Sequence, residues 1–417
     1  MNKYFLTLVR WWVTPKLPLE HILISSKDNS GNVYQIWRDY FAKWIVHPIK
    51  RRISKYYIKS LREFFGLKIV GITGSTGKTS TKEMIFSILE QKGETVASFA
   101  NIDPVYNIPT TILSCKPTTK YLVLEMGVEY PGEMDFYLWL ARPDIGIIIN
   151  IHPTHTEYFG GLDGVAKEKS KLVRYLPVDA LAILGTNNKF FNQISKRIRA
   201  KLVTFGEKGD VFSERIQLTD QLKTKFVLVN SSGKISIQLP VFGKHFVENA
   251  LAASAAASTL GFSNSEIKKG LENYEMPEHR MTVIKLKSGA LVLDDSYNNN
   301  PAAAAEAITT LLAFPGERER IFVFGDMLEL GKLEKLSHQE IGRLILTSKI
   351  DKLICVGKAS KYTYNIVVKR MKRNNCFWIK DSISAVDSVK SLINRNSVVL
   401  VKGSRSIGLE KLVETLK

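Results

Sequence analysis

A glycine-rich segment at residues 71–80, Gly-Ile-Thr-Gly-Ser-Thr-Gly-Lys-Thr-Ser, leaves few folds open to this chain. It ends a β-branched run and leads into a helical pattern that begins at Lys78. Glycines let the backbone approach phosphate oxygens, and the N-terminus of a helix attracts their negative charge. The strict phosphate-loop pattern requires glycine where Ile72 stands, so the match is to a shortened form, Gly-x-x-Gly-Lys-Thr. We predict a nucleotide site in which Lys78 reaches the outer phosphates and Thr79 ligates Mg²⁺.

From residue 67 onwards, short β-branched runs alternate with helical segments, which is typical of α/β domains. The continuous apolar run at 145–149 indicates a parallel sheet that is buried on both faces. Residues 201–240 are predicted to form short strands at an antiparallel edge, before an alanine-rich helix at 246–260. The other predicted strands lie at 68–73, 121–125 and 144–150 in a first series, and at 291–294, 321–324, 352–356 and 398–401 in a second.

We therefore expect an α/β fold in three parts. A basic, aromatic-rich helical segment at 1–66 precedes a central phosphate-loop (P-loop) ATPase domain with a parallel sheet at 67–279 and a C-terminal Rossmann-like α/β domain at 280–417. The length of 417 residues fits two or three domains of about 150 residues each, and 45% hydrophobic residues are too many for a disordered chain. Three cysteines far apart in sequence favour a reducing, cytoplasmic compartment. The apolar run at 4–13 is too short to cross a bilayer and lacks a signal cleavage site.

The chain carries 59 basic and 40 acidic side chains, and its net charge of +19 attracts polyanionic partners. Residues 1–66 alone hold twelve Lys and Arg against four Asp and Glu, together with four of the six tryptophans. Two interpretations are open for this segment. It is either a helical appendage with solvated charges or a surface that binds an anionic membrane.

Polar side chains also follow the later strands. Glu125 ends the second predicted strand, at the edge where open α/β sheets bind their ligands. His155 lies in a loop after the 145–149 strand and can reach a metal from there, with a surface position as the simpler alternative. Lys167 and Lys169 begin a lysine-rich helix that is either a solvated face or directed at the site. Segments 294–301, 324–331 and 401–406 take equivalent positions in the second series, which suggests a substrate cleft between the domains.

With these motifs the chain resembles the Mur ligases, the ATP-dependent amide-forming enzymes of peptidoglycan synthesis, over residues 67–417. Within that family it is most similar to the members that add D-alanyl-D-alanine to a UDP-N-acetylmuramoyl tripeptide. The segments that carry the resemblance are 72–84 (ITGSTGKTSTKEM), 125–127 (EMG), 142–143 (RP), 160–167 (GGLDGVAK), 249–253 (NALAA), 294–301 (DDSYNNNP), 325–331 (GDMLELG) and 402–405 (KGSR). The last two are the more specific ones.

The resemblance implies a role for each candidate site residue. The residues that it implies for binding the ATP phosphates are Gly74, Ser75, Thr76, Gly77, Lys78, Thr79 and Ser80. The implied magnesium ligands are Thr79, Glu125, His155 and a carbamylated Lys169, with Lys167 as the alternative to Lys169. The nucleotide contacts implied in the C-terminal half are Asn249 for the base, Asp295 for the ribose, Asn298 as a lining residue and Arg280 for a phosphate. The implied catalytic set is Lys78, Lys169, His155 and Arg280.

The activity that the resemblance implies is an amide ligation that uses ATP and Mg²⁺. A tripeptide carboxylate becomes an acyl phosphate, and the amine of D-alanyl-D-alanine then attacks it. The expected partners are these two substrates and no nucleic acid, and the expected oligomeric state is a monomer. Two alternatives stay open: a Mur-like ligase for another carboxylate, and a catalytically silent, membrane-associated ATP-binding regulator.

This chain departs from the family pattern in three places. Residues 243–246 (GKHF) stand where Gly-x-His-Asn is usual, so Phe246 replaces the asparagine, and residues 185–188 (GTNN) replace a usual Asn-x-Asp-Asp turn. The larger departure is that residues 1–66 lack the glycine-rich strand–turn pattern of the family's UDP-binding domain. Either this segment and the cleft bind UDP, or the substrate lacks the usual UDP group. For residues 1–66 we favour binding of UDP over a membrane role. Weak membrane-surface contact through residues 1–66 remains the alternative.

Overall fold

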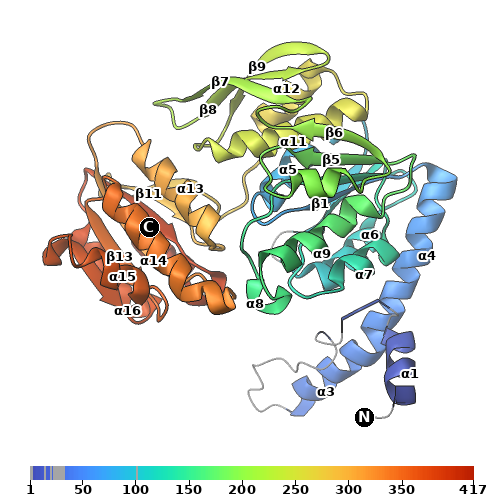
Figure 1. The fold of residues 1–417 in the computed structure, drawn as a ribbon, viewed down its shortest axis with the longest axis horizontal. Coiled ribbons are helices and arrows are strands. Elements are labelled where there is room, and N and C mark those ends of the chain that lie inside the picture. Colours follow the sequence, from blue (N-terminus) through green and yellow to red (C-terminus); the bar gives the residue numbers. More distant parts are fainter. Residues whose placement is uncertain (1–2, 14–15, 19–20, 22–32, 100–101) are drawn as a thin grey trace. The chain divides into compact units, whose positions relative to one another are not determined.

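The computed structural model describes residues 3–13, 16–18, 21, 33–99 and 102–417, so part of the predicted N-terminal segment lies outside the described residues. The chain forms two compact units (Figure 1). The first comprises 1–151, 166–212 and 251–270, and the second comprises 152–165, 213–250 and 271–417. Each unit is built around a six-stranded sheet with helices packed against it, which confirms the predicted α/β class.

A parallel sheet in the order β2-β3-β1-β4-β5-β6 forms the core of the first unit. Its strands are β1 (Lys68–Thr73), β2 (Thr95–Ala97), β3 (Tyr121–Glu125), β4 (Ile145–Ile148), β5 (Leu181–Gly185) and β6 (Lys201–Phe205). Apolar side chains such as Ile69, Ile72 and Ile147 are fully buried on its faces. Because the strands are parallel, the carboxyl ends of β1, β3 and β4 lie at one edge of the sheet, and the glycine-rich segment begins there.

Helices connect and cover these strands. α5 and α6 contact both β2 and β3, and α4 (His47–Phe65) packs against α6 and α7. Besides the N-terminal helices, the helices that lie wholly in this unit are α5 (Lys78–Leu89), α6 (Pro104–Ser114), α7 (Glu133–Leu140) and α10 (Phe191–Ser195). Those that span both units are α9 (Leu162–Arg174), α11 (His245–Thr259) and α12 (Asn264–Asn273).

A long helical segment precedes the first strand, as predicted. α3 (Val33–Phe41), one π-helical turn η1 (Ala42–Val46) and α4 (His47–Phe65) follow one another without a break in helical backbone. The buried face of α4 consists of Pro48, Arg51, Ser54, Ile58 and Leu61. α1 (Lys3–Val13) lies against α4, because the Arg52 guanidinium donates hydrogen bonds to the carbonyls of Trp11 and Trp12. Trp12 Nε1 in turn donates to the Trp44 carbonyl at 2.5 Å.

The second unit contains a mixed sheet in the order β10-β11-β15-β12-β13-β14, in which only the edge strand β10 is antiparallel. Its strands are β10 (Thr282–Lys285), β11 (Leu291–Asp295), β12 (Glu319–Gly325), β13 (Lys352–Val356), β14 (Cys376–Ile379) and β15 (Ser397–Lys402). Its helical elements are α8 (Thr156–Phe159), α13 (Pro301–Leu312), η2 (Gly331–Leu333), α14 (Glu334–Thr347), α15 (Lys361–Val367), η3 (Arg373–Asn375), α16 (Ser382–Leu392), η4 (Arg405–Ile407) and α17 (Leu409–Leu416). Val323, Val399 and Leu412 belong to its apolar core.

The prediction for residues 201–240 was wrong in its arrangement. β6 is a parallel strand of the main sheet, whereas β7 (Phe212–Leu218), β8 (Thr224–Asn230) and β9 (Gly233–Leu239) form a separate three-stranded sheet. β8 and β9 are an antiparallel hairpin with alternately buried side chains such as Phe226 and Leu228. A run of short strands does not reveal which partner each strand pairs with, and that choice depends on long-range contacts.

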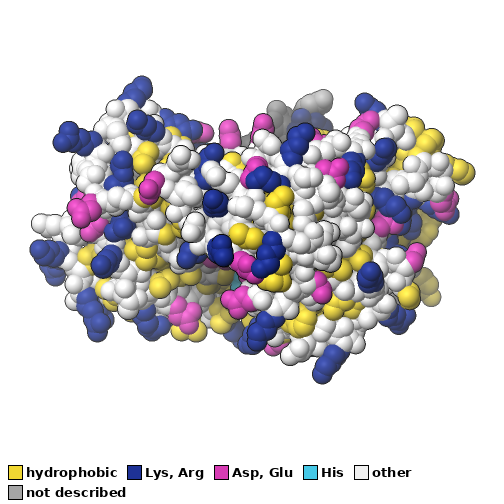
Figure 2. Space-filling view, turned by 90° about the horizontal axis from the view of Figure 1, so that it is seen from above, with side chains coloured by type: hydrophobic (Ala, Val, Ile, Leu, Met, Phe, Trp, Pro, Cys, Tyr) yellow, Lys and Arg dark blue, Asp and Glu magenta, His cyan; other side chains and the backbone are white. Residues whose placement is uncertain are grey.

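Basic side chains are spread widely over the surface. Figure 2 shows Lys and Arg across the face that it draws, interspersed with Asp and Glu. Among the described residues, no helix is both long and apolar enough to cross a membrane.

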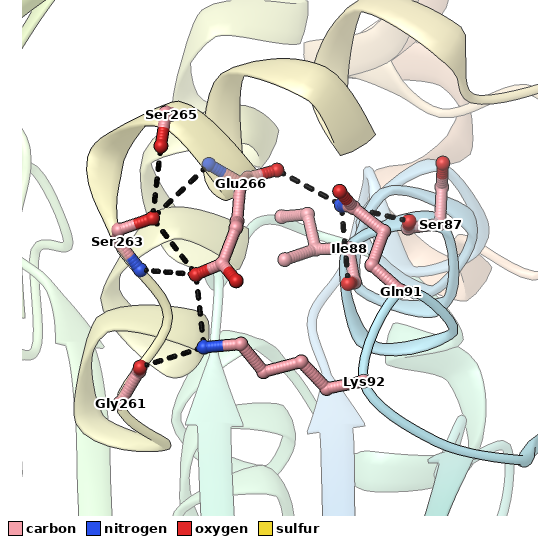
Figure 3. A network of polar contacts seen from close by, with 8 residues as sticks. All are labelled: Ser87, Ile88, Gln91, Lys92, Gly261, Ser263, Ser265 and Glu266. Atoms are coloured by element: carbon pink, nitrogen blue, oxygen red, sulfur yellow. Dashed lines mark hydrogen bonds and ion pairs between the residues drawn. The ribbon is translucent and has the colours of Figure 1, made fainter.

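A polar network holds α12 against the end of α5 in the first unit (Figure 3). Lys92 Nζ lies 2.9 Å from Glu266 Oε2 and donates to the Gly261 carbonyl at 3.0 Å. Gln91 Nε2 donates to the Glu266 carbonyl at 2.9 Å. Ser263 and Glu266 also form a capping box, since Glu266 Oε2 accepts the Ser263 N–H at 2.8 Å. These contacts hold the turn between α11 and α12, and the first turn of α12, against the residues that follow α5, the helix of the phosphate loop.

We expect that replacing Glu266 by glutamine will weaken the dependence of the unfolding free energy on pH in the acidic range. The Lys92 ammonium, followed by the Ser263 donors, lowers the pKa of Glu266 from 4.5 to about 2. A depressed carboxylate pKa contributes stability that is present above pH 4.5 and is lost as the pH falls towards 2. Urea unfolding at a series of pH values should show a shallower slope between these limits for Glu266→Gln than for the wild type. Glu90→Gln, an exposed position next to the network, is the matched control, and an equal slope for both variants would contradict this role of Glu266.

Candidate active site

The segment between β1 and α5 has the geometry of a phosphate-binding loop. Gly77 adopts a left-handed conformation with φ of 78°, which turns the chain into the first turn of α5 at Lys78. Lys78 Nζ folds back over the loop and donates to the Gly74 carbonyl at 3.1 Å. Gly127 lies beside this side chain, and a Cβ there would be 3.3 Å from Lys78 Cε. The loop, the start of the helix and the lysine thus occupy the arrangement that the sequence predicted for anion binding.

Asn150, which the sequence analysis did not single out, holds the loop from the end of β4. Its Oδ1 accepts hydrogen bonds from the N–H groups of Ser75 at 3.1 Å and Thr76 at 2.9 Å. Its Nδ2 donates to Thr76 Oγ1 at 2.8 Å, and its backbone carbonyl accepts from the Ser75 N–H at 3.1 Å. The only signal in the sequence was its place directly after a buried strand. Asn150 positions the loop backbone rather than facing the ligand.

We expect Asn150→Ala to loosen the phosphate loop. The partly buried Thr76 N–H would lose its acceptor, and the loss of a buried acceptor costs about 1–3 kcal/mol of unfolding free energy as an upper range. The Michaelis constant for ATP should rise as well, because the loop would no longer be held in one conformation. Urea unfolding and ATP titration would measure both effects. Asn230→Ala also removes an acceptor of a backbone N–H, but in the exposed β8–β9 hairpin turn, and it should leave the Michaelis constant for ATP unchanged. An Asn150→Ala protein as stable as the wild type would contradict this assignment.

Lys169 reaches the same loop from α9. It is 1% exposed, and its Nζ donates to the Gly74 carbonyl at 3.2 Å. Burial, and then the nearby Lys78 ammonium, lower the pKa of Lys169 well below its ordinary value. Glu168 helps to orient this helix, because its Oε1 accepts the N–H groups of Gly132 and Met134 at 3.0 Å each. Lys167, the alternative left open by the sequence, is exposed.

The end of β3 supplies the carboxylate of the site. Glu125 Oε2 accepts a hydrogen bond from Thr79 Oγ1 at 2.9 Å, and the Glu125 N–H donates to Ser98 Oγ at 3.1 Å. A hydroxyl and a carboxylate at this separation are the oxygen ligands that Mg²⁺ prefers, with phosphates and water completing its shell. Among the described residues, no group of three or more His, Cys, Asp or Glu side chains forms a metal site by itself. Thr79 and Glu125 therefore fit a cation that is held jointly with nucleotide phosphates.

His155 belongs to the second unit, where it precedes α8 in a left-handed conformation with φ of 51°. Its Nδ1 lies 2.5 Å from Glu329 Oε2, and this contact lowers the pKa of Glu329. Thr156 Oγ1 donates to the Leu330 carbonyl at 2.9 Å. Two residues of the 325–331 motif, Glu329 and Leu330, thus hold the loop that contains His155. A carboxylate at one ring nitrogen is the usual way to orient a histidine whose other nitrogen binds a ligand.

The remaining candidate residues lie at strand ends of the second unit. Asp295, at the end of β11, lies 2.5 Å from Lys402 Nζ, which also donates to the Asn298 carbonyl at 3.0 Å. Burial raises the pKa of Asp295, and the Lys402 ammonium opposes that shift. Lys402 belongs to the 402–405 motif, whose pattern alone indicated no role for it, and in the structure it orders this loop.

Arg280 lies over an aromatic ring of the same loop. Its guanidinium carbon is 4.2 Å from the centre of the Tyr297 ring, and Arg405 approaches that ring at 5.2 Å. His279 beside it has Nδ1 2.7 Å from Asp294 Oδ2. Asn249 is buried in the first half of α11. Arg280, Asp295, Asn298 and Asn249 thus all belong to the second unit, whereas Gly74–Ser80, Glu125 and Lys169 are gathered in the first.

A phosphate loop on a parallel sheet, followed by a second α/β unit with this strand order, is the architecture of a nucleotide-dependent ligase. Comparison with protein families agrees: the Mur ligase middle domain matches residues 72–257, and the Mur ligase glutamate ligase domain matches residues 279–405. The chain belongs to the Mur ligase family, whose members are ATP-dependent ligases.

Particular relatives narrow this further. The chain is 34% identical to the UDP-N-acetylmuramoyl-tripeptide–D-alanyl-D-alanine ligase of Escherichia coli K12, over 90% of this chain and 85% of that one. The crystal structure of MurF from Acinetobacter baumannii superposes with a TM-score of 0.81 at 30% identity, covering 88% and 79% of the two chains. MurF ligase from Thermotoga maritima, solved in complex with ADP, has the same fold, with a TM-score of 0.78 at 24% identity over 88% and 82%. These matches confirm the family that the sequence motifs indicated.

Proposed function

We propose that this chain adds D-alanyl-D-alanine to a UDP-N-acetylmuramoyl tripeptide at the expense of ATP, in the synthesis of peptidoglycan precursors. The observation that carries the proposal is the convergence of Lys78, Lys169 and Glu125 on one phosphate loop. The chain is also similar, over most of its length, to relatives named for this reaction.

The reaction has two steps. The γ-phosphoryl group of ATP moves to the terminal carboxylate of the tripeptide, giving an acyl phosphate and ADP. The amine of D-alanyl-D-alanine then attacks the acyl carbon, a C–N bond forms, and phosphate leaves while the amine loses a proton. The loop 74–80 binds the phosphates, and the Lys78 ammonium compensates the charge that develops on the group in transfer.

Thr79 and Glu125 would hold the metal, and His155, oriented by Glu329, would contribute from the second unit. When bound, Mg²⁺ supplies positive charge that neutralises the phosphate oxygens. Lys169 would serve as a carboxylate after carbamylation. Its lowered pKa favours the neutral amine, whose Nζ forms a bond to the carbon of CO₂ and releases one proton. Burial of Lys169 and exposure of Lys167 support Lys169 as the modified residue.

Residues of the second unit would hold the rest of the nucleotide. Asn249 is assigned to the base, Asp295 to the ribose and Arg280 to a phosphate, with Asn298 lining the site. Lys402 holds Asp295 in place for this contact. We also keep the division at 1–66, 67–279 and 280–417 as a proposal, which limited proteolysis with and without ATP would test.

Residues 1–66 remain our candidate for contacts to the UDP part of the substrate. Part of this segment lies beside the start of α7, where His21 Nε2 is 2.5 Å from Glu133 Oε1. A cytoplasmic location is proposed because all three cysteines are free and buried, as in reducing compartments.

The direct test supplies the purified chain with UDP-N-acetylmuramoyl tripeptide, ATP and D-alanyl-D-alanine. We expect phosphate release that requires both substrates, and a product heavier by one D-alanyl-D-alanine less one water. With ¹⁸O in the tripeptide carboxylate, one label should appear in the released phosphate, because the acyl phosphate transfers that oxygen. Phosphate release with another carboxylic acid but not with the tripeptide would favour the alternative ligase. No release with any acid would favour the silent regulator.

A further inference from the structure

Exposed apolar side chains recur along the outward side of the long N-terminal helical segment, from Trp37 to Phe64. Large side chains recur there at intervals of three, four or eight residues; we call this set the outer stripe: Trp37, Phe41, Ile45, Ile49, Ile53, Tyr56 and Phe64. Such spacing places them along one side of a helix. Trp37 is 71% exposed, Phe41 61% and Phe64 77%. At 1.5 Å per residue, the outer stripe is about 40 Å long.

The opposite side of α4 is already occupied by the first unit. Ser54 Oγ donates to the Pro109 carbonyl at 3.1 Å, and Tyr57 OH donates to the Cys115 carbonyl at 2.7 Å. Arg62 Nη2 lies 2.8 Å from Asp144 Oδ1. These contacts fix the rotation of the helix, so the exposure of the outer stripe follows from how α4 is anchored rather than from a loosely attached helix.

The apolar surface widens at its N-terminal end. Trp37, Tyr40, Phe41 and Trp44 line an open pocket of about 540 Å³. α1, held to α4 by Arg52, adds a second exposed apolar face at Tyr4, Leu8 and Trp11. Soluble monomers rarely expose contiguous apolar surface of more than a few hundred Å², so a surface of this kind marks an interaction site.

The net charge of the segment that carries the outer stripe is positive. Residues 33–65 contain eight Lys and Arg against two Asp and Glu. Arg38 and Lys59 are exposed, and each has only a surface pair, with Asp39 at 3.6 Å and Glu63 at 3.7 Å. A helix with an apolar aromatic face and basic flanks is the pattern of a segment that lies in the plane of a membrane interface. Tryptophan and tyrosine are the residues that favour that depth.

We propose that the outer stripe docks this enzyme on an anionic lipid bilayer surface, with α3, η1 and α4 parallel to the membrane plane. A uridine diphosphate is far too short to cover 40 Å of helix, and it needs polar partners rather than a row of isoleucines. The basic flanks match phosphate headgroups, which are available along the entire length of a bilayer. Contact with UDP by other parts of residues 1–66 is compatible with this proposal.

The test is sedimentation of the full chain with vesicles of phosphatidylcholine alone and of phosphatidylcholine with phosphatidylglycerol. We expect binding to the anionic vesicles that weakens with salt. Trp37→Ser with Phe41→Ser should lower the partition coefficient at least about tenfold, because each removes a large apolar side chain from the interface. Tyr175→Ser with Val178→Ser removes equally exposed apolar side chains elsewhere in the first unit and should have no effect. Arg38→Glu should weaken binding roughly fivefold or more at low salt.

The apolar pair of variants separates docking from the general attraction of a basic protein, since it leaves the net charge unchanged. Circular dichroism and ATP affinity would establish that the variants are folded. Equal binding by both apolar double variants would overturn the proposal, because charge alone would then explain the sedimentation. A wild type that ignores anionic vesicles but self-associates through Trp37 and Phe41 would also overturn it, and would make the outer stripe an interface between copies.

Discussion

Lys169→Ala should lower the turnover number for ligation by about 10² to 10³-fold, the range expected when one preorganised charge is removed from a transition state. The side chain is buried and its Nζ donates to the Gly74 carbonyl, so thermal unfolding of the variant should accompany the assay to separate lost chemistry from lost packing. Excess bicarbonate cannot restore the activity, because the variant has no amine to carbamylate. Small carboxylic acids such as acetate should restore part of it, since they supply the missing carboxylate.

Lys167→Ala is the matched control, because it removes a lysine two residues away on the same helix from an exposed position. It should be fully active. A ¹³C carbamate resonance in the wild type that disappears in Lys169→Ala and persists in Lys167→Ala would identify the modified residue without an activity assay. A fully active Lys169→Ala enzyme and an inactive Lys167→Ala enzyme would show that the wrong lysine was chosen.

Lys78→Ala should abolish ATP turnover while leaving the melting temperature close to that of the wild type. Lys78 is only half-buried, and its Nζ contacts the loop carbonyl of Gly74 rather than the apolar core. Its charge faces the loop where the phosphates are expected, so its loss should affect the transferred phosphoryl group most. ADP release in single-turnover experiments, together with thermal unfolding, measures the two effects separately.

The control for this variant is Lys68→Ala, which removes an exposed lysine from the start of β1, at the opposite end of the strand from the loop. It should turn over ATP normally. Wild-type turnover by Lys78→Ala would remove the basis for the phosphate-loop assignment, and a large fall in its melting temperature would show that the lysine is structural.

Much of the core could be predicted from the sequence, because local patterns carry that information. The apolar run at 145–149 can only be stable when both faces are covered, and it forms the central strand β4. The glycine-rich segment indicated a strand–loop–helix unit, because a β-branched run leads into the glycines and a helical pattern begins at Lys78. Motifs quoted at 325–331 and 402–405 do take part in ordering the loops around His155 and Asp295.

What the sequence determined by itself was therefore the α/β class, the phosphate loop and the family. Only the tertiary structure decided that β6 joins the parallel sheet, that Asn150 clamps the loop, and that Lys169 rather than Lys167 is buried against it. The physical reason is the same in each case: strand partners, the acceptor of a loop amide and the rotation of a helix are set by residues distant in sequence. The rotation of α4 follows the same rule, since its contacts with α6 decide which face of the helix is buried and leave the apolar outer stripe exposed.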